Sequence, residues 1–173
     1  RLSLVGSEMC IRDRYIDANA TTTPFPWPLP VTIPVGPDGF PNLTACQQLN
    51  FGLYLFTAAE QASWGQLYNS SDGAHGWGAI AAFWHAVAST FNTSDGVLGY
   101  ELFNEPQAGD LYRNPLDFLI PGQADKNNLL PWYRDSILPA VRAVDSQHMV
   151  FYEPAVTEVF LLQNTGFGEG GPG

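Results

Sequence analysis

Hydrophobic and polar positions follow helical spacing in some parts of the chain and strand spacing in others. Apolar residues recur every three to four positions in residues 46–68, 77–91 and 128–145, and this spacing predicts three amphipathic helices. Two shorter apolar runs, residues 97–103 and 148–154, predict buried strands. The order helix, strand, helix, strand is typical of βα units in a parallel sheet, so the pattern indicates an α/β fold.

Prolines and glycines mark the segments between these elements. Residues 15–45 contain seven prolines and little helical periodicity, which predicts a long surface loop. Polar composition with glycine or proline predicts two further loops, residues 69–76 and 107–126. Pro139 lies inside the third predicted helix, and we expect a kink there because proline removes one backbone hydrogen bond. The tail, residues 166–173, is rich in glycine.

The first predicted strand leads into the motif Asn104-Glu105-Pro106. Proline cannot continue a strand ladder, so the strand should stop near Glu105. An amide and a carboxylate then lie where a strand opens into a loop, which is the edge at which parallel α/β folds build their active sites. The second predicted strand delivers another carboxylate, Glu153, to the same edge.

A longer string around this motif, YELFNEPQAGD at residues 100–110, resembles the fourth barrel strand of glycoside hydrolase family 5, and within it the endoglycoceramidase-like branch. The resemblance implies that Glu105 is the general acid/base and that Asn104 holds a hydroxyl group of the bound sugar. Close relatives usually have tryptophan after the proline, and this chain has Gln107. Sugar stacking is therefore not carried over to that position.

The run FPWPLP, residues 25–30, resembles the extended loop that follows the third strand in endoglycoceramidases and shapes the substrate groove. Trp27 is a candidate sugar or lipid contact in this loop, and a plain packing role is the simpler alternative. The implied fold class is α/β, a partial (β/α)8 TIM barrel that runs from about the third-strand loop to the fifth-strand region. A complete barrel needs roughly 250 residues, so we expect a chain of 173 residues to be an incomplete barrel.

The resemblance also implies a mechanism with two carboxyl groups. Retaining glycosidases hold a nucleophile and an acid/base about 5–5.5 Å apart, and burial or a neighbouring charge must raise the pKa of the acid/base. Glu105 is expected to experience both effects. Glu153 is interpreted as a structural neighbour, because the family's nucleophile follows the seventh strand. Glu101 should alternate with Phe103 and Glu105 on one face of the strand, pointing into the barrel, where a buried carboxylate needs a cationic partner; we expect an arginine from strands that this chain lacks.

Charge and composition exclude several classes of protein. The net charge of −10 argues against binding nucleic acid, whose phosphates require a basic surface. Most of the aromatic residues are accounted for by core packing, although rings also suit sugar binding. His75 and His85 lack carboxylate or cysteine partners at ligand spacing, so no metal is expected, and no cofactor is implied. Cys10 and Cys46 alone define no disulfide framework, and no apolar run reaches membrane-spanning length.

The beginning of the chain differs from the rest. Residues 1–14 contain three of the seven basic residues and resemble nothing in the family, so we interpret them as a non-native leader. Residues 15–173 are then a fragment of a glycoside hydrolase catalytic domain. Three Asn-x-Ser/Thr sequons in polar, loop-like contexts favour a secreted or lysosomal/vesicular protein; they begin at Asn42, Asn69 and Asn92.

Three functional hypotheses follow. The first is a fragment of a retaining β-glycosidase that hydrolyses O-glycosyl bonds of glycosphingolipids, with a glycolipid or oligosaccharide substrate and peripheral contact with a lipid surface; a glucosylceramidase, steryl glucosidase or β-glucanase is a variant of it. The second is an inactive carbohydrate- or lipid-binding barrel. The third is an unrelated α/β domain with a fortuitous triplet. A glutamate at the end of the seventh strand would favour the enzyme over the binding barrel.

Overall fold

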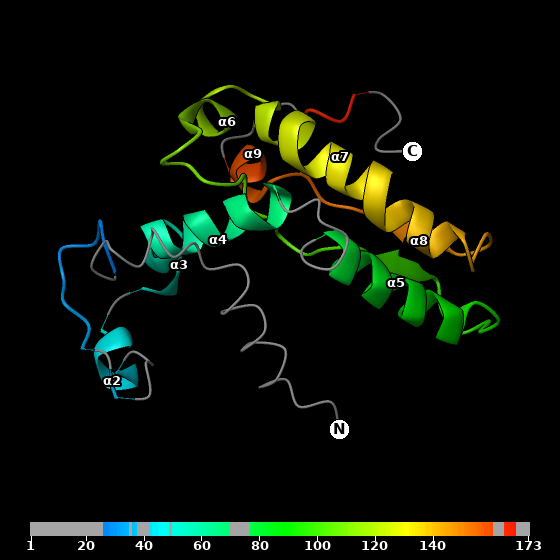
Figure 1. Ribbon diagram of the computed structural model, residues 1–173, viewed down its shortest axis with the longest axis horizontal. Coiled ribbons are helices and arrows are strands. Elements are labelled where there is room, and N and C mark those ends of the chain that lie inside the picture. Colours follow the sequence, from blue (N-terminus) through cyan, green and yellow to red (C-terminus); the bar gives the residue numbers. More distant parts are fainter. Residues whose placement is uncertain are drawn as a thin grey trace.

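Helices pack against one face of a two-stranded parallel sheet in the computed structural model, which describes residues 26–34, 36–37, 42–48, 50–69, 77–160 and 165–168 (Figure 1). The first half contributes α2 (Leu43–Cys46), α3 (Phe51–Tyr54), α4 (Ala58–Asn69), α5 (Trp77–Phe91) and strand β1 (Gly99–Glu101). The second half contributes α6 (Pro115–Leu119), π-helical η2 (Asp125–Leu129), α7 (Leu130–Trp132), π-helical η3 (Tyr133–Ile137), α8 (Leu138–Arg142), strand β2 (Met149–Phe151) and α9 (Val156–Phe160).

The two strands pair in parallel, with Tyr100 opposite Val150. Helical segments α6 to α8 connect them, so the region is a βαβ unit, as the sequence pattern predicts. Both strands lie inside their predicted ranges and are shorter than those ranges. The ladder gains one more bond past β1, where the Leu102 N–H donates to the carbonyl of Phe151 at 3.0 Å. The chain then leaves the sheet before the Asn104-Glu105 motif.

The core lies between the sheet and the helices that cover one of its faces. Tyr100 and Leu102 point from the strand into this core, where Trp132 and Tyr133 are completely buried. Helix α5 packs alongside α8 and η3, and its limits match the predicted helix at residues 77–91 (Figure 1). The amphipathic pattern of that segment therefore reports its packing correctly.

The helix predicted at residues 46–68 is wrong as a single element. The structure has the short α3, a turn, and then α4 from Ala58. Thr57 explains the break, because its side chain is buried and its hydroxyl donates to the carbonyl of Tyr54 at 2.8 Å. The same oxygen accepts the N–H of Glu60 at 3.4 Å, and a threonine in this arrangement caps the start of a helix.

The helix predicted at residues 128–145 begins three residues earlier and contains two π-helical segments, η2 and η3. Each π segment ends two residues before a proline, Pro131 or Pro139, which then occupies the first turn of an α segment. Proline has no N–H to donate in the ordinary α pattern, and the wider π turn accommodates that loss. At Pro139, where a kink was predicted, the structure shows a change from π-helical to α-helical hydrogen bonding.

The predicted loops are reproduced in part. Residues 26–34 form irregular turns, but α2 begins at Leu43, so the end predicted for this loop at residue 45 is wrong. Residues 15–25, 35 and 38–41 of this loop, residues 70–76 of the next one and the leader at residues 1–14 lie outside the described residues. The loop predicted at residues 107–126 contains α6, which begins with proline at its first turn. Asn69, predicted to begin a loop, is the last residue of α4, and its side-chain amide donates to the carbonyl of Gly65 at 2.7 Å. Within the described ranges, no helix combines the length and apolar character needed to cross a bilayer.

Candidate active site

The mouth of β1 carries the residues that the sequence singles out. Asn104 and Glu105 follow the last ladder bond, and both are exposed. Glu105 has a φ of 48°, in the left-handed region that side chains other than glycine rarely adopt. Pro106 comes directly after it and is buried. The motif therefore lies at the carboxyl edge of the sheet, where it was predicted.

Glu153, at the end of β2, meets this motif through the backbone. The N–H of Glu105 donates to Oε2 of Glu153 at 2.6 Å. The carboxyl group of Glu101 hydrogen-bonds the carboxyl group of Glu153, and this bond, then partial burial and the repulsion between the two charges raise the pKa of Glu101. Three glutamates from two strands are thus joined at one edge of the sheet.

One expectation about this edge is wrong. The predicted alternation of Glu101, Phe103 and Glu105 on one face fails because β1 ends at Glu101, and the ring of Phe103 turns towards Trp64 at a centroid distance of 5.4 Å. Glu101 is exposed among the described residues, and its expected cationic partner, on strands outside this chain, stays a prediction. The face of the sheet opposite the helices is open in the described part of the chain.

The predicted burial of Glu105 is likewise not supplied by the described residues, since its side chain is exposed. Its place at the strand mouth agrees with the acid/base assignment. The acid/base role of Glu105 and the sugar-binding role of Asn104 stay predictions.

The loop that follows Glu105 is fixed by bonds from three different elements. The Tyr68 hydroxyl in α4 donates to the carbonyl of Gln107 at 2.7 Å, and Nδ2 of Asn128 in η2 donates to the carbonyl of Ala108 at 2.7 Å. The N–H of Val156 donates to the carbonyl of Pro106 at 2.8 Å. Gln107 is buried, so the side chain in the usual tryptophan position offers no surface for a sugar ring.

Two buried carboxylates hold neighbouring loops in place, and the sequence pattern did not single them out as site residues. Asp125 accepts the N–H of Ala155 at 2.7 Å and that of Gly166 at 2.9 Å, and burial raises its pKa although these two bonds oppose the shift. Glu158 accepts the N–H of Gly122 at 2.9 Å, and burial raises its pKa as well. Their only sequence signature is an acidic residue in the first turn of a short helix, which is too common to identify them.

Trp27 lies on the surface, 45% exposed, with its ring centroid 5.0 Å from that of Tyr112. Its carbonyl accepts the N–H of Ala58, so the loop is tied to the start of α4. The packing role is realised with Tyr112, and the exposed part of the ring leaves the predicted ligand contact as a prediction.

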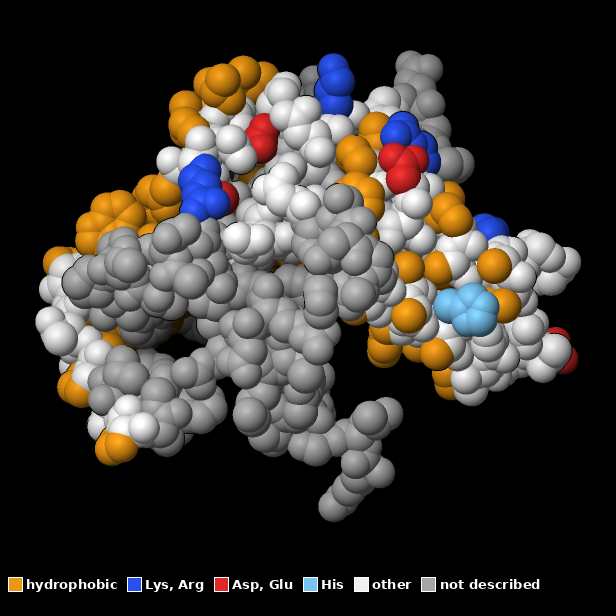
Figure 2. Space-filling model, viewed as in Figure 1, with side chains coloured by type: hydrophobic (Ala, Val, Ile, Leu, Met, Phe, Trp, Pro, Cys, Tyr) orange, Lys and Arg blue, Asp and Glu red, His pale blue; other side chains and the backbone are white. Residues whose placement is uncertain are grey.

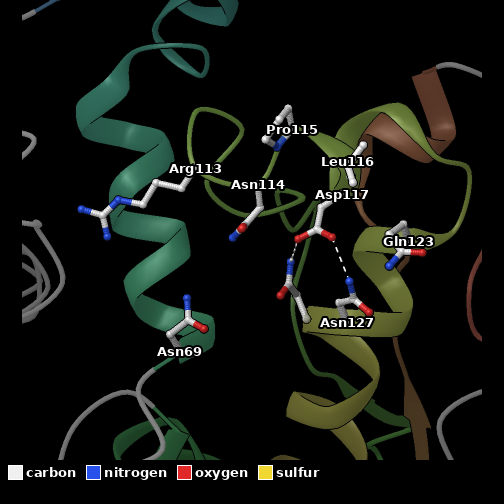
Figure 3. Close-up of a pocket in the computed structure, with 9 residues that line it drawn as sticks. Asn69, Arg113, Asn114, Pro115, Leu116, Asp117, Gln123 and Asn127 are labelled. Carbon is white, nitrogen blue, oxygen red and sulfur yellow. Dashed lines mark hydrogen bonds between the residues drawn. The ribbon is translucent and has the colours of Figure 1, made fainter.

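A polar pocket of about 570 Å³ lies away from these residues (Figure 3). Asp117 bridges two amides inside it, accepting from Asn127 at 2.9 Å and from Asn128 at 3.2 Å. None of Asn104, Glu105 and Trp27 lines it. The lining comes from the end of α4, the start of α6 and the segment around η2: Asn69, Arg113, Asn114, Pro115, Leu116, Asp117, Gln123, Asn127 and Asn128.

No group of three or more metal-ligating side chains occurs in the part of the chain that the structure describes. His85 lies exposed on α5, whereas His75 is outside the described residues. His148 instead belongs to a network at the amino end of β2. Its Nδ1 lies 2.7 Å from Oδ2 of Asp145, and its Nε2 lies 3.1 Å from the carbonyl of Ser94.

The fold and the acidic strand mouth define an α/β protein whose candidate chemistry lies at the carboxyl edge of a parallel sheet. Residues 50–156 match the family model described as cellulase, glycosyl hydrolase family 5, and the chain belongs to that family. The predicted resemblance and the α/β barrel class are thereby confirmed.

The curated relatives that match include two endoglycoceramidases. The chain is 42% identical to one from Cyanea nozakii over 137 residues, which are 79% of this chain and 26% of the relative. It is 37% identical to one from Hydra vulgaris over 147 residues, which are 84% of this chain and 27% of the relative. The chain therefore spans about a quarter of the length of these relatives, 26% and 27%.

Solved structures of an endoglycoceramidase are also similar to this chain. Endo-glycoceramidase II from Rhodococcus sp. in complex with ganglioside GM3 superposes with a TM-score of 0.56 and 25% identity, covering 78% of this chain and 26% of that one. The same enzyme in complex with a cellobiose-like imidazole gives a TM-score of 0.54 and 26% identity, with 78% and 27% covered.

Proposed function

We propose that a full-length protein carrying this chain is a retaining β-glycosidase that cleaves the O-glycosyl bond of glycosphingolipids. The 42% identity to the endoglycoceramidase of Cyanea nozakii is the single observation that carries this proposal. The ganglioside complex of the Rhodococcus enzyme, whose fold this chain shares in part, supports a glycolipid substrate.

In this reaction Glu105 is the general acid/base. It donates a proton to the glycosidic oxygen as the bond to the sugar breaks, and afterwards its carboxylate takes a proton from the attacking water. Asn104 holds a sugar hydroxyl beside the reacting carbon, because an amide offers both a donor and an acceptor. The position of both residues at the mouth of β1 supports these roles.

Within the barrel, we assign β1 to the fourth strand and β2 to the fifth. The parallel pairing of the two strands, with a helical crossover between them, supports the assignment. The attacking carboxylate then belongs to the seventh strand, which this assignment places after the present chain.

Contact with a lipid surface is a further part of the proposal. Helix α6 presents Leu116 and Leu119 with 60% and 65% of their surface exposed, and hydrophobic side chains gather over this helix in the upper left of Figure 2. Because the net charge is −10, attraction to anionic lipids cannot drive such contact, so it has to be apolar. Binding to zwitterionic vesicles that is insensitive to salt, and weaker in Leu119→Ser, would support it.

A secreted or lysosomal route is proposed from the three sequons. Asn42 and Asn69 are exposed, although Nδ2 of Asn69 donates to the carbonyl of Gly65 in its own helix, whereas Asn92 is partly buried and its Nδ2 donates to the distant carbonyl of Val144 at 3.0 Å. Glycans are therefore expected at the first two positions in preference to the third. The test is to produce the protein in eukaryotic cells, remove N-linked glycans with a glycosidase and compare mobility on a gel. The mobility change seen on treatment should become smaller in Asn42→Gln and Asn69→Gln and stay the same in Asn92→Gln.

The assay that tests the function uses the full-length protein with a glycosphingolipid substrate. Glu105→Gln should reduce turnover by about a hundredfold or more, since general acid/base catalysis typically contributes that much. Parallel assays with glucosylceramide, a steryl glucoside and a β-glucan separate the enzymatic alternatives. A full-length protein that binds glycolipid without turnover would support the inactive binding barrel instead.

A further inference from the structure

We propose that Glu153 is a positioning residue. Its carboxylate holds the peptide of Glu105 in the left-handed conformation that presents the acid/base at the strand mouth. The proposal rests on the role of Glu105 proposed above.

The backbone of Glu105 is the first observation. A residue with a β-carbon at a φ of 48° is crowded by its own carbonyl group, so the conformation persists only when its surroundings impose it. The short bond from the Glu105 N–H to Oε2 of Glu153, 2.6 Å, fixes the peptide on one side. The bond from the Val156 N–H to the carbonyl of Pro106 fixes the other side. Both partners come from the segment that follows β2.

The surroundings of Glu153 are the second observation. Two carboxyl groups can hydrogen-bond each other only when one of them carries a proton, and the bond to Glu153 raises the pKa of Glu101. The hydroxyl of Tyr133 in η3 donates to the backbone carbonyl of Glu153 at 3.2 Å, which anchors the residue from the helical side. Asp125 in η2 adds negative charge near Tyr133. Burial raises the pKa of Tyr133, so this donor stays protonated.

The consequence concerns proton donation. A general acid has to lie within hydrogen-bond reach of the leaving oxygen, and the backbone angle of Glu105 sets the direction in which its side chain leaves the strand. Without the acceptor on Glu153, the peptide of Glu105 is free to relax towards ordinary φ values. The value of kcat/KM should then fall most for substrates whose leaving group needs a proton.

The experiment compares two aryl β-glycosides in the full-length protein: a phenyl glycoside, which needs protonation, and a 2,4-dinitrophenyl glycoside, which does not. Glu153→Ala should reduce kcat/KM for the phenyl substrate about tenfold more than for the dinitrophenyl substrate, a part of the usual general-acid contribution. Glu153→Gln retains an oxygen acceptor and should show a smaller difference. Asp135→Ala, which removes an exposed carboxylate paired with Arg134, is the matched control and should leave the ratio unchanged.

Equal losses on both substrates in Glu153→Ala and Glu153→Gln, or no loss in either, would overturn the positioning role. Should Glu153→Ala fail to fold, as judged by circular dichroism, Glu153→Gln carries the comparison alone. Glu105→Gln distinguishes the two proposals. If it keeps full activity on the phenyl substrate, the acid/base assignment itself fails. If it loses only that activity while the Glu153 variants are unchanged, only the positioning role fails.

Discussion

Tyr68 shows how a single hydroxyl group supports the loop of the candidate site from a distant helix. It is buried, and it donates to the carbonyl of Gln107, two residues after Glu105. Burial raises its pKa well above the ordinary tyrosine value, so the hydroxyl remains a donor at every working pH. The loop therefore depends on a contact made by a residue 39 positions earlier in the chain.

Removing this hydroxyl should be costly. Tyr68→Phe leaves a buried carbonyl without its donor, and the free energy of unfolding is expected to fall by about 1–3 kcal/mol. Tyr112→Phe is the matched control, because the Tyr112 hydroxyl also donates to a backbone carbonyl, that of Phe56, but at an exposed site. Its effect should stay within about 0.5 kcal/mol. Urea denaturation of the three proteins measures both values, and equal effects would contradict the role of burial.

The pH dependence of stability should follow His148. Both of its ring nitrogens face atoms that only accept, Oδ2 of Asp145 and the carbonyl of Ser94, so the ring needs both of its protons. The bond with Asp145 and then the bond with Ser94 raise the pKa of His148 above 6.5. A raised pKa stabilises the folded state fully below about pH 6.5, and that stabilisation is lost as the pH rises through the folded-state pKa.

The melting temperature should therefore fall as the pH rises above about 6.5, and less steeply in His148→Gln. Asp145 acts at the other end of the scale. Burial alone would raise its pKa, but bonds from Tyr100 and from the backbone and ring of His148 lower it. Its contribution is present above about pH 4 and is lost as the pH falls further, outside this window. Identical slopes in both proteins would show that another group is responsible.

The residue scale also shows how much of the site could be predicted. Asn104 and Glu105 were found from the sequence because Pro106 marks the end of a strand regardless of its surroundings. The bond between Glu105 and Glu153 could not be found in this way, since it depends on the positive φ of Glu105, which no hydrophobic pattern encodes. The exposure of Glu105 depends in turn on which other segments cover the sheet.

At the scale of elements, the sheet depends on a close approach between its two strands. A β-carbon at Gly99 would lie 2.3 Å from the carbonyl oxygen of Met149, which belongs to the opposite strand. Glycine at this position is required by the pairing itself.

Gly99→Ala should therefore separate β1 from β2 and destabilise the fold by about 1–3 kcal/mol or more, the usual cost of overpacking. Gly96→Ala is the control, because the nearest atom to its added carbon is Oγ of Ser94 at 3.9 Å. Thermal unfolding followed by circular dichroism measures the difference. A Gly99→Ala protein as stable as the control would contradict the observed strand pairing.

The elements differ in how well the sequence predicts them. Helix α5 is predicted to the residue because Ile80, Trp84 and Val87 of its apolar stripe pack against the core, although Phe91 at its end is 44% exposed. The helix predicted at residues 46–68 fails because Thr57 starts a new helix, and a capping hydroxyl leaves the hydrophobic spacing on either side almost unchanged. The π segments before Pro131 and Pro139 are likewise invisible to a pattern that assumes 3.6 residues per turn.

At the scale of the whole molecule, activity should need more than the present residues. The family's nucleophile follows the seventh strand, and a retaining mechanism requires both carboxyl groups. We expect the 173-residue chain to show no turnover of a fluorogenic β-glycoside, in contrast to the full-length protein. Turnover by the short chain that is lost in Glu105→Gln would contradict this, and the same variant in the full-length protein is the control.

The sheet has a further consequence for anyone handling this chain. In the described residues β1 and β2 pair only with each other, so each strand keeps one edge with unsatisfied backbone groups, and Leu98 and Phe151 beside these edges are 70% and 42% exposed. Such edges accept any strand of suitable length. They make the chain prone to self-association when it is isolated, and they also make it a candidate piece of a split enzyme reassembled from separately produced polypeptides.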